Sequence, residues 1–308
     1  MVVFLTPAYL GFNGGSEGWY QEMSTAGTAA LTTYGKFLGN RYKNYPNLVW
    51  LDGGDYNPPN KALVTAIVTG IKTFDPVHLH TAHVNQGSSP VAIYNSEGWL
   101  DFSNVYTYPV NNNAVPVYNK SLAEYGRSNW KPFFLAESTY EGEYSAPQTL
   151  IRQQAYEALL SGAMGDFFGN RPIWLFDPGW DVALNSRGSL DMVNVRLFFT
   201  SRHWERLVPD SAHAFVTAGL GNSTTTHLVA ARAADGSWGA AYIPTARTIT
   251  VSLNGFSGIV SAHWYDPTSG AMTTVTGSPF TNAGTVNIAT PGLNATGTAD
   301  WVLVFDLQ

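Results

Sequence analysis

From residue 1 to about residue 205, short apolar runs alternate with longer amphipathic stretches. The short runs are rich in Val, Ile, Phe, Tyr and Trp and are followed by Gly, Pro or Asn, which predicts strands. The predicted strands are Val2–Thr6, Leu48–Asp52, Val77–Ala82, Asn104–Tyr108, Phe133–Glu137 and Ile173–Phe176. The amphipathic stretches predict helices, over Tyr20–Lys43, Ala62–Phe74, Val117–Asn129, Gln148–Ser161 and Leu190–Leu207. Strands that alternate with helices imply βαβ units and a parallel sheet.

The pattern changes from about Ser211 onward. Short apolar runs such as TITVSL and WVLVFDL now follow one another directly, separated by Gly, Asn and Pro turns. Short strands at regular spacing predict a β-sandwich. The sequence therefore predicts an α/β domain over residues 1–208 and an all-β sandwich over residues 209–308.

The number of predicted strands in the first part limits its fold. Six is two fewer than the eight that close a TIM barrel. A doubly wound sheet is the competing fold, but it usually carries a Gly-rich phosphate-binding turn after its first strand. The Gly-rich stretch GFNGGSEGW lacks the G-x-G-x-x-G spacing. We therefore favour a (β/α)8 TIM-type barrel that is incomplete.

Composition excludes several classes of partner. The 308 residues are 44% hydrophobic and 12% charged, so the chain can bury a sizeable core. A net charge of −6 argues against nucleic acid or an anionic membrane as partner, because phosphate groups are bound by basic surfaces. No apolar run approaches the ~18 residues of a membrane span. The absence of cysteine excludes disulfides and thiol chemistry, and the first residues lack the features of a signal peptide.

Three acids stand at the ends of predicted strands, where a βα barrel carries its chemistry. Asp52 ends its strand, Asp55 follows in a Gly-Gly turn, and Glu137 ends FFLAE. Cleavage of a glycosidic bond requires two carboxyl groups across a cleft. One donates a proton to the leaving oxygen, and the other attacks or stabilises the anomeric carbon. The alternative for Asp55 and Glu137 is a helix cap or an ion pair, and for Asp52 a structural role is favoured.

Aromatic side chains and one histidine gather at or beyond the predicted strand ends and favour a sugar ligand. Aromatic faces stack on the C–H faces of sugar rings, and hydroxyl or imidazole groups bind sugar hydroxyls. A chain with 14% aromatic residues also places some of them there by chance. The predicted substrate-binding residues of this kind are Trp19, Tyr56, His83, Tyr108, Tyr140 and Trp174, and Tyr20 and Trp180 lie at similar positions.

Two motifs indicate other chemistry. The histidines of HLHTAH, which are His78, His80 and His83, suggest a metal site, but no acid stands at convincing ligand spacing. We therefore expect no metal and no cofactor. The segment GGSEG matches the G-x-S-x-G motif of serine esterases, but Ser16 does not follow a strand directly, as that mechanism requires.

The chain resembles the apiosidase-like glycoside hydrolases, those of glycoside hydrolase family 140 and its relatives. Four segments carry the resemblance in the family's order: VVFLTPAYLGF, LVWLDGGDYN, FFLAESTYE and RQQAYEALLSGAMGDFFGNRPIW. The segment AAYIPTARTITVSLNGFSGIVSAHWYDPTSGAM resembles the collagen-binding type of β-sandwich that usually follows that catalytic domain. The resemblance implies a TIM barrel that cleaves glycosidic bonds with retention, outside the cell or in the periplasm. Asp55 would be the acid/base, Glu137 the nucleophile, and Glu141 a second acid that supports the substrate site.

The same resemblance implies that part of the barrel is absent. If Val2–Thr6 corresponds to the family's third strand, the first two βα units are not in this chain. Open edges at Val2–Thr6 and Ile173–Phe176 would then be covered by a loop or the sandwich, or closed by a homodimer. The family usually has His and Tyr where this chain has Asp166 and Phe168, so substrate contacts there are expected to differ.

The sequence therefore predicts a retaining glycoside hydrolase that acts on plant or microbial polysaccharides or oligosaccharides. The alternative is a non-catalytic carbohydrate-binding remnant of such an enzyme, and a serine esterase is a weaker one. In RQQAYEALL, Arg152 is expected either to be buried against a strand-end carboxylate or to be a surface charge.

Overall fold

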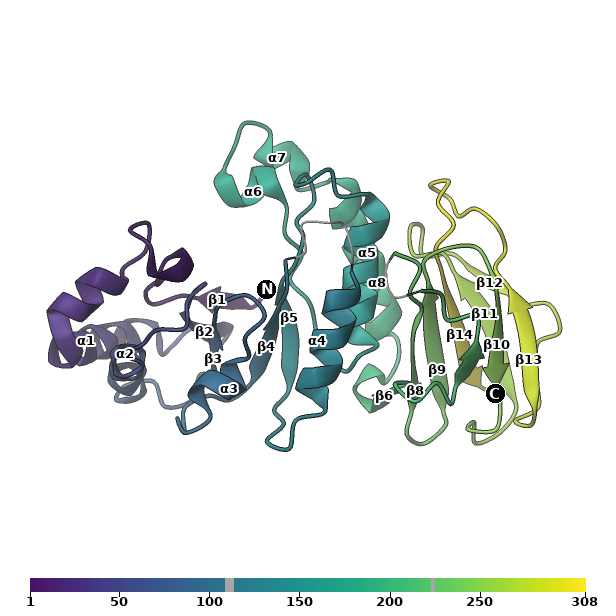
Figure 1. Ribbon diagram of the computed structural model, residues 1–308, viewed down its shortest axis with the longest axis horizontal. Coiled ribbons are helices and arrows are strands. Elements are labelled where there is room, and N and C mark those ends of the chain that lie inside the picture. The colour runs from purple at the N-terminus through teal and green to yellow at the C-terminus, as the bar shows by residue number, and fades with distance from the viewer. Residues whose placement is uncertain (109–113, 223–224) are drawn as a thin grey trace. The chain divides into compact units, whose positions relative to one another are not determined.

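The computed structural model describes residues 1–108, 114–222 and 225–308. This part of the chain divides into two compact units. The first comprises Met1–Tyr106 and Arg127–Ala136, and the second comprises Thr107–Gly126 and Glu137–Gln308. Figure 1 labels most elements of the two units, which are described separately below.

The first unit contains a parallel sheet with the order β1-β2-β3, formed by β1 (Val3–Leu5), β2 (Leu48–Gly53) and β3 (His80–His83). A second, two-stranded sheet consists of β4 (Ser103–Tyr106) and β5 (Phe133–Glu137). The helices of this unit are α1 (Tyr20–Tyr42), α2 (Ala62–Lys72) and the short α3 (Pro90–Tyr94). The α1 and α2 backbones approach closely, because a Cβ at Gly35 would lie 2.1 Å from the Ile67 carbonyl oxygen.

The second unit contains five helices and nine strands within the described residues. The helices are α4 (Val115–Tyr125), α5 (Gln148–Leu159), α6 (Arg171–Leu175), α7 (Trp180–Ala183) and α8 (Arg187–Thr200). The strands are β6 (Leu207–Pro209), β7 (Val216–Ala218), β8 (Val229–Ala233), β9 (Trp238–Ile243), β10 (Thr248–Ser252), β11 (Val260–Tyr265), β12 (Met272–Thr274), β13 (Thr285–Ala289) and β14 (Trp301–Leu307).

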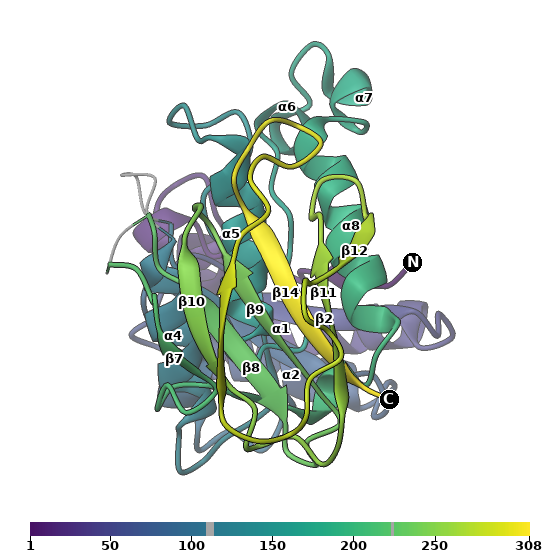
Figure 2. The ribbon, with the colours of Figure 1, turned by 90° about the vertical axis from the view of Figure 1, so that its right-hand side faces the viewer.

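These strands form an antiparallel sandwich, as the regular spacing of short strands predicts (Figure 2). One sheet has the order β12-β11-β14-β9-β8-β6 and the other β13-β10-β7. An apolar core that includes Phe215, Val251 and Phe305 fills the space between the sheets. The six-stranded sheet also packs on α5 and α8, where the rings of Tyr156 and Tyr242 stack with centroids 4.6 Å apart. This sheet is therefore buried on both faces.

Arg152 of α5 is fully buried against carboxylates, one of which directly precedes a strand of the sandwich, so it is not a surface charge. Its guanidinium donates to Asp191 of α8 at 2.6 Å and to Asp300, directly before β14, at 2.9 Å. Two carboxylates around one buried guanidinium satisfy its charge and its donors. The network therefore ties two helices to the six-stranded sheet.

The predicted strand Ile173–Phe176 is wrong, because these residues lie in or directly after the helix α6. Pro172 sits in the first turn of that helix, where its fixed φ suits a helix and its missing N–H costs nothing. The helix ends at Phe176, whose backbone is left-handed with φ 53°. The other predicted strands before residue 140 correspond to β1 to β5, so this part of the chain is mixed α/β. No helix among the described residues has the length and hydropathy needed to span a membrane.

Candidate active site

The turn after β2 gives Asp55 an unusual backbone. Gly53, Gly54 and Asp55 all have positive φ, at 85°, 141° and 37°. Glycine adopts such angles readily because it has no Cβ. A Cβ at Gly54 would also lie 2.3 Å from the ring of Tyr9. The Gly-Gly pair therefore lets the chain turn sharply and leaves room for Tyr9 beside Asp55.

Two neighbours hold the Asp55 carboxylate. The Tyr9 hydroxyl donates to Asp55 Oδ2 at 2.8 Å, and His83 Nδ1 lies 3.2 Å from Oδ1. When Nδ1 carries no proton, it instead accepts the backbone N–H of Asp55 at 3.2 Å, because one ring nitrogen cannot donate and accept at once. Partial burial acts to raise the pKa of Asp55, but His83 and the Tyr9 hydroxyl outweigh it, so this pKa lies below its usual value.

Glu137 is the last residue of β5, whose other four residues belong to the first unit. Its Oε1 accepts a hydrogen bond of 2.8 Å from the Tyr140 hydroxyl, three residues further on. The Tyr140 ring lies against Gly169, where a Cβ would be 2.0 Å from a ring carbon. A glycine at 169 is therefore required for this position of Tyr140.

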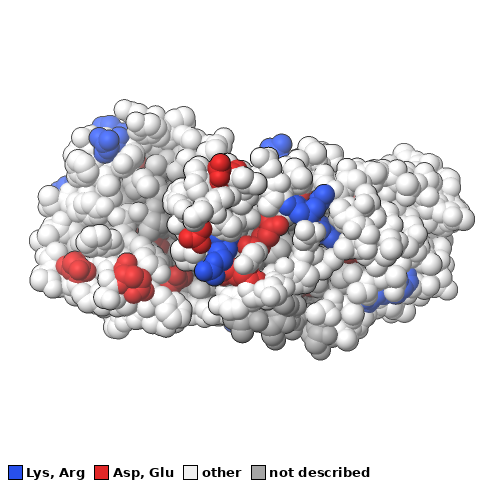
Figure 3. Space-filling model, turned by 90° about the horizontal axis from the view of Figure 1, so that it is seen from above, with Lys and Arg blue, Asp and Glu red and all other residues white. Residues whose placement is uncertain are grey.

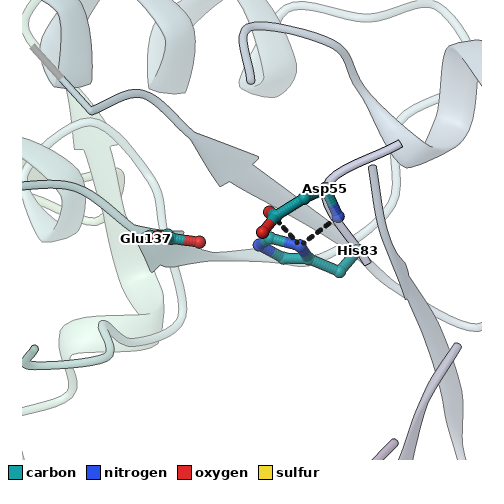
Figure 4. Close-up of side chains that lie close together, drawn as sticks. All are labelled: Asp55, His83 and Glu137. Carbon is teal, nitrogen blue, oxygen red and sulfur yellow. Dashed lines mark hydrogen bonds and ion pairs between the residues drawn. The ribbon is translucent and has the colours of Figure 1, made fainter. Parts of the chain in front are cut away.

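Asp55, His83 and Glu137 come together although the chain separates them widely (Figure 4). One nitrogen or oxygen atom of each side chain lies within 4.8 Å of the others. In Figure 4 the Asp55 carboxyl lies beside the His83 ring, and Glu137 points toward both of them. Two carboxylates and an imidazole can exchange protons with a ligand, and the same three groups are also a ligand set for a divalent ion.

The three histidines of HLHTAH contact three different carboxylates instead of sharing one site. His78 Nδ1 lies 2.6 Å from Asp75, and His80 Nδ1 lies 2.8 Å from Asp52. His80 and Asp52 are both buried, and burial raises the pKa of Asp52 although His80 opposes this. These two pairs therefore belong to the packing of the first unit, and only His83 lies beside Asp55.

The predicted substrate-binding aromatics occupy both units. In the first, the Trp19 side chain is 59% exposed, and the Tyr56 ring packs edge-on against Tyr20. In the second, Tyr108 and Tyr140 pack edge-on with centroids 5.3 Å apart, and Trp174 lies 6.4 Å from Tyr140.

Glu141 has the geometry of a structural support. Its Oε2 accepts hydrogen bonds from Asn170 and Ser186, and its Oε1 accepts the backbone N–H of Gly188 in the first turn of α8. A carboxylate at a helix N-terminus satisfies backbone donors that have no partner within the helix. A direct contact of Glu141 with substrate therefore stays a prediction.

Several polar residues at the site escaped the sequence reasoning. Tyr9 directly follows the first strand's TPA segment, and that position could have identified it. Glu143 accepts hydrogen bonds from the Tyr108 hydroxyl and from Trp174 Nε1, the latter at 3.1 Å. Asn13 donates its backbone N–H to the Asp55 carbonyl and accepts a side-chain hydrogen bond from Asn85. The positions of Glu143 and Asn13 depend on contacts between distant segments, which no local pattern reports.

The remaining candidates lie elsewhere. Ser16 is exposed and follows a 3-10 turn (Phe12–Gly14), not a strand, so it lacks the setting of an esterase nucleophile. Asp166 and Phe168 line an apolar cavity of about 320 Å³ with Met164, Met192 and Trp204 among others. Burial raises the pKa of Asp166 to about 6.

Comparisons with known proteins assign a family model to each of the two parts of the chain. The family model described as "Apiosidase-like, catalytic domain" matches residues 1–206, and the one described as "Putative collagen-binding domain of a collagenase" matches residues 208–306. No curated protein matches the sequence.

Solved structures share the fold. A structure titled "Glycoside hydrolase" is 24% identical with a TM-score of 0.78, over 92% of this chain and 69% of its own. A glycoside hydrolase family 5 protein from Bacteroides vulgatus is 22% identical with a TM-score of 0.81, over 93% and 68%. A GH27 β-L-arabinopyranosidase from Geobacillus stearothermophilus is 9% identical with a TM-score of 0.51, over 90% and 62%. At these identities the similarity is one of fold.

Proposed function

The chain belongs to the apiosidase-like family, and from this premise we propose that it is a retaining glycoside hydrolase acting on plant or microbial polysaccharides or oligosaccharides. One observation carries the proposal, which is the convergence of Asp55 and Glu137 beside His83. Carboxyl groups of retaining glycosidases lie about 5–5.5 Å apart, and those of inverting ones about 6.5–9.5 Å apart. The nearest ligand atoms here lie within 4.8 Å, which supports retention.

In the first step, Glu137 attacks the anomeric carbon and forms a glycosyl-enzyme ester. Asp55 donates its proton to the glycosidic oxygen, and the C–O bond to the leaving group breaks. In the second step, ionised Asp55 takes a proton from water, whose oxygen attacks the anomeric carbon and releases Glu137. The Tyr140 hydroxyl donates to Glu137 Oε1 and so holds the carboxyl group in place for the attack.

The family assignment suggests the first substrates to test. We propose a panel of aryl glycosides that includes an apioside, together with pectin, xylan and other plant polysaccharides. Product anomers followed by NMR during the first turnovers distinguish retention from inversion.

Variants separate the two roles. Glu137→Gln should abolish hydrolysis of every aryl glycoside. Asp55→Asn should abolish it for poor leaving groups but spare dinitrophenyl glycosides, which leave with little acid assistance. Glu205→Gln, at an exposed carboxylate, is the matched control. Full activity of Glu137→Gln would refute the assignment.

The same assay tests the expectation that no metal is required. Treatment with EDTA should leave the rate unchanged, because both proton transfer and nucleophilic attack are assigned to side chains. A loss of activity that Zn²⁺ or Mn²⁺ reverses would instead assign Asp55, His83 and Glu137 as metal ligands.

Saturable glycan binding without turnover on any substrate would favour the non-catalytic carbohydrate-binding alternative.

A further inference from the structure

The segment that contains α6 and α7 exposes an unusual number of large apolar side chains. Figures 1 and 2 show these short helices beyond the ends of α5 and α8. The exposed side chains are Trp174, Leu175, Phe176, Trp180, Val182 and Leu184. Phe176 is 73% exposed and Trp174 is 55% exposed. Contiguous exposed apolar surface of this kind marks a binding site more often than chance.

Aromatic rings connect this segment to Glu137. The Tyr140 hydroxyl donates to Glu137, and the Tyr140 ring lies 6.4 Å from Trp174 and 5.3 Å from Tyr108. At the outer end, Phe176 and Trp180 pack edge-on with centroids 5.6 Å apart. We call Tyr108, Tyr140, Tyr144, Trp174, Phe176 and Trp180 the aromatic platform.

A buried carboxylate fixes the inner part of the platform. Glu143 is 9% exposed, and it accepts hydrogen bonds from the Tyr108 hydroxyl and from Trp174 Nε1. Both rings are thereby held in one orientation, which reduces the entropy lost when a ligand binds. A surface that served only as packing would not need a buried charge to orient exposed rings.

Backbone strain is concentrated on the same residues. Tyr108, Tyr144 and Phe176 have positive φ at 87°, 48° and 53°. Side chains with a Cβ rarely adopt this region, and such strain is found at ligand clamps more often than elsewhere. Three aromatic rings are therefore presented by backbone that costs conformational energy.

The chemistry of the platform indicates a sugar chain as its ligand. Ring faces bind the C–H faces of sugars without needing charge, and a polyanion or an acidic lipid surface would need a basic patch. Figure 3 views the side on which α6 and α7 lie; acidic and basic side chains are mixed near the middle of that face, and no large basic patch gathers there.

We propose that the aromatic platform binds further sugar residues of the chain whose scissile bond lies at Glu137. The inference rests on the proposed function and makes the substrate an extended polysaccharide or oligosaccharide, not a short glycoside. Phe176 and Trp180 then contact sugars several units away from the bond that is cleaved.

Kinetics on a ladder of oligosaccharides tests the proposal. The ladder is prepared from whichever of pectin, xylan, xyloglucan or mixed-linkage β-glucan the full-length protein hydrolyses. Trp180→Ala should lower kcat/KM about tenfold on the longest oligosaccharides and by a clearly smaller factor on the aryl glycoside. Trp130→Ala, at a tryptophan that is 49% exposed outside the platform, is the matched control. Equal effects of Trp180→Ala on short and long substrates, or none, would overturn the proposal.

Binding is measured separately, so that failure of the hydrolase assignment can be recognised. Affinity electrophoresis uses four gels, each of which contains one of the same four polysaccharides. At least one polysaccharide should slow the migration of the wild type, and it should slow Trp180→Ala less. Retardation without hydrolysis would overturn the proposed reaction and keep the platform as a glycan site. Equal migration in all four gels would overturn the platform. If the wild type is a dimer, Trp180→Ala converts it to a monomer, and the retardation by polysaccharide is unchanged, the aromatic platform is a protein interface and not a glycan site.

Discussion

The proposed role of Asp55 as proton donor contrasts with surroundings that favour its ionised form. The Tyr9 hydroxyl and His83 keep its pKa low, yet the first step of the proposed reaction needs its proton. The rate should therefore fall as the pH rises through this pKa, and the optimum should lie on the acidic side. The neighbours of Asp55 thus set the pH range of the enzyme.

Removing the Tyr9 hydroxyl should move that range. Tyr9→Phe deletes a hydrogen bond to ionised Asp55, so its pKa rises and the alkaline limb of the pH–rate profile should move up by roughly 0.5–1 unit. The measurement is kcat/KM against pH on an aryl glycoside. Tyr34→Phe, which removes a hydroxyl bonded to the Pro7 carbonyl, should not move the profile. A shift toward lower pH would contradict the acid role of Asp55.

Asp166 gives a prediction about stability. Its pKa of about 6 in the folded state exceeds the unfolded value of about 3.9, so the folded state binds this proton more tightly. Its contribution to stability is present below about pH 4 and is lost as the pH rises through 6. Asp166→Asn should therefore raise the free energy of unfolding at pH 8 by about 1–2 kcal/mol, a figure reduced because the side chain is partly exposed. In urea unfolding at pH 4, Asp166→Asn and the wild type should have the same free energy of unfolding. Asp181→Asn is the control and should not change this free energy at pH 4 or at pH 8.

At the scale of elements, the sequence predicts best where one local pattern decides. The strand Phe133–Glu137 is found with the predicted bounds, because a continuous apolar run is bounded by a polar signal. Ile173–Phe176 has equally apolar residues, yet Pro172 and the left-handed Phe176 make a short helix there. The carboxyl end of β5 was therefore predictable, whereas the placement of Trp174 on a helix was not.

Contacts between distant segments lie beyond such patterns. Tyr9 and Asp55 are 46 residues apart, and Arg152 and Asp300 are 148 apart. The residue types suggested that two carboxylates form the site, but the side chains that contact them are set by the packing of distant segments. Glu143 was missed for the same reason, since its role depends on Tyr108 and Trp174 lying on either side of it.

The loop before α6 should control Tyr140. Gly169→Ala places a Cβ about where the Tyr140 ring now lies, so the ring must move and its hydrogen bond to Glu137 should break. We expect kcat/KM to fall by about ten- to a hundredfold with little change in circular dichroism. Gly165→Ala is the matched control, because its Cβ would have no neighbour within 4 Å. Equal activity of the two variants would show that Tyr140 does not position the nucleophile.

At the scale of the whole molecule, one question is whether the chain pairs with a second copy of itself. β1 lies at the edge of its sheet within the described residues, and Val2 and Val3 are 62% and 42% exposed there. An exposed apolar edge strand pairs readily with another chain. The homodimer expected from the sequence is therefore proposed to form through β1.

Light scattering after size exclusion tests this assembly. The dimer should have twice the 33.4 kDa mass of the chain, and Val3→Lys should convert it to the monomer because a buried charge at the edge is costly. Val77→Lys changes an exposed valine outside any strand and should leave the mass unchanged. A wild-type protein that is monomeric at every concentration would refute the proposed dimer through β1.

The sandwich is expected to support catalysis through α5. Arg152 binds Asp300 of the sandwich, and Gln154, two residues along the same helix, accepts hydrogen bonds from Ser138 and Thr139 directly after Glu137. Asp300→Asn should cost about 3–5 kcal/mol in urea unfolding, because it leaves the buried network with an unbalanced charge. Hydrolysis should fall as well, since α5 no longer fixes the segment after β5. Asp306→Asn breaks a partly exposed pair with Arg202, whose side chains are 16% and 35% exposed, and should cost less than about 1 kcal/mol with unchanged activity. If both variants behave alike, the sandwich acts as an independent module and not as a support for Glu137.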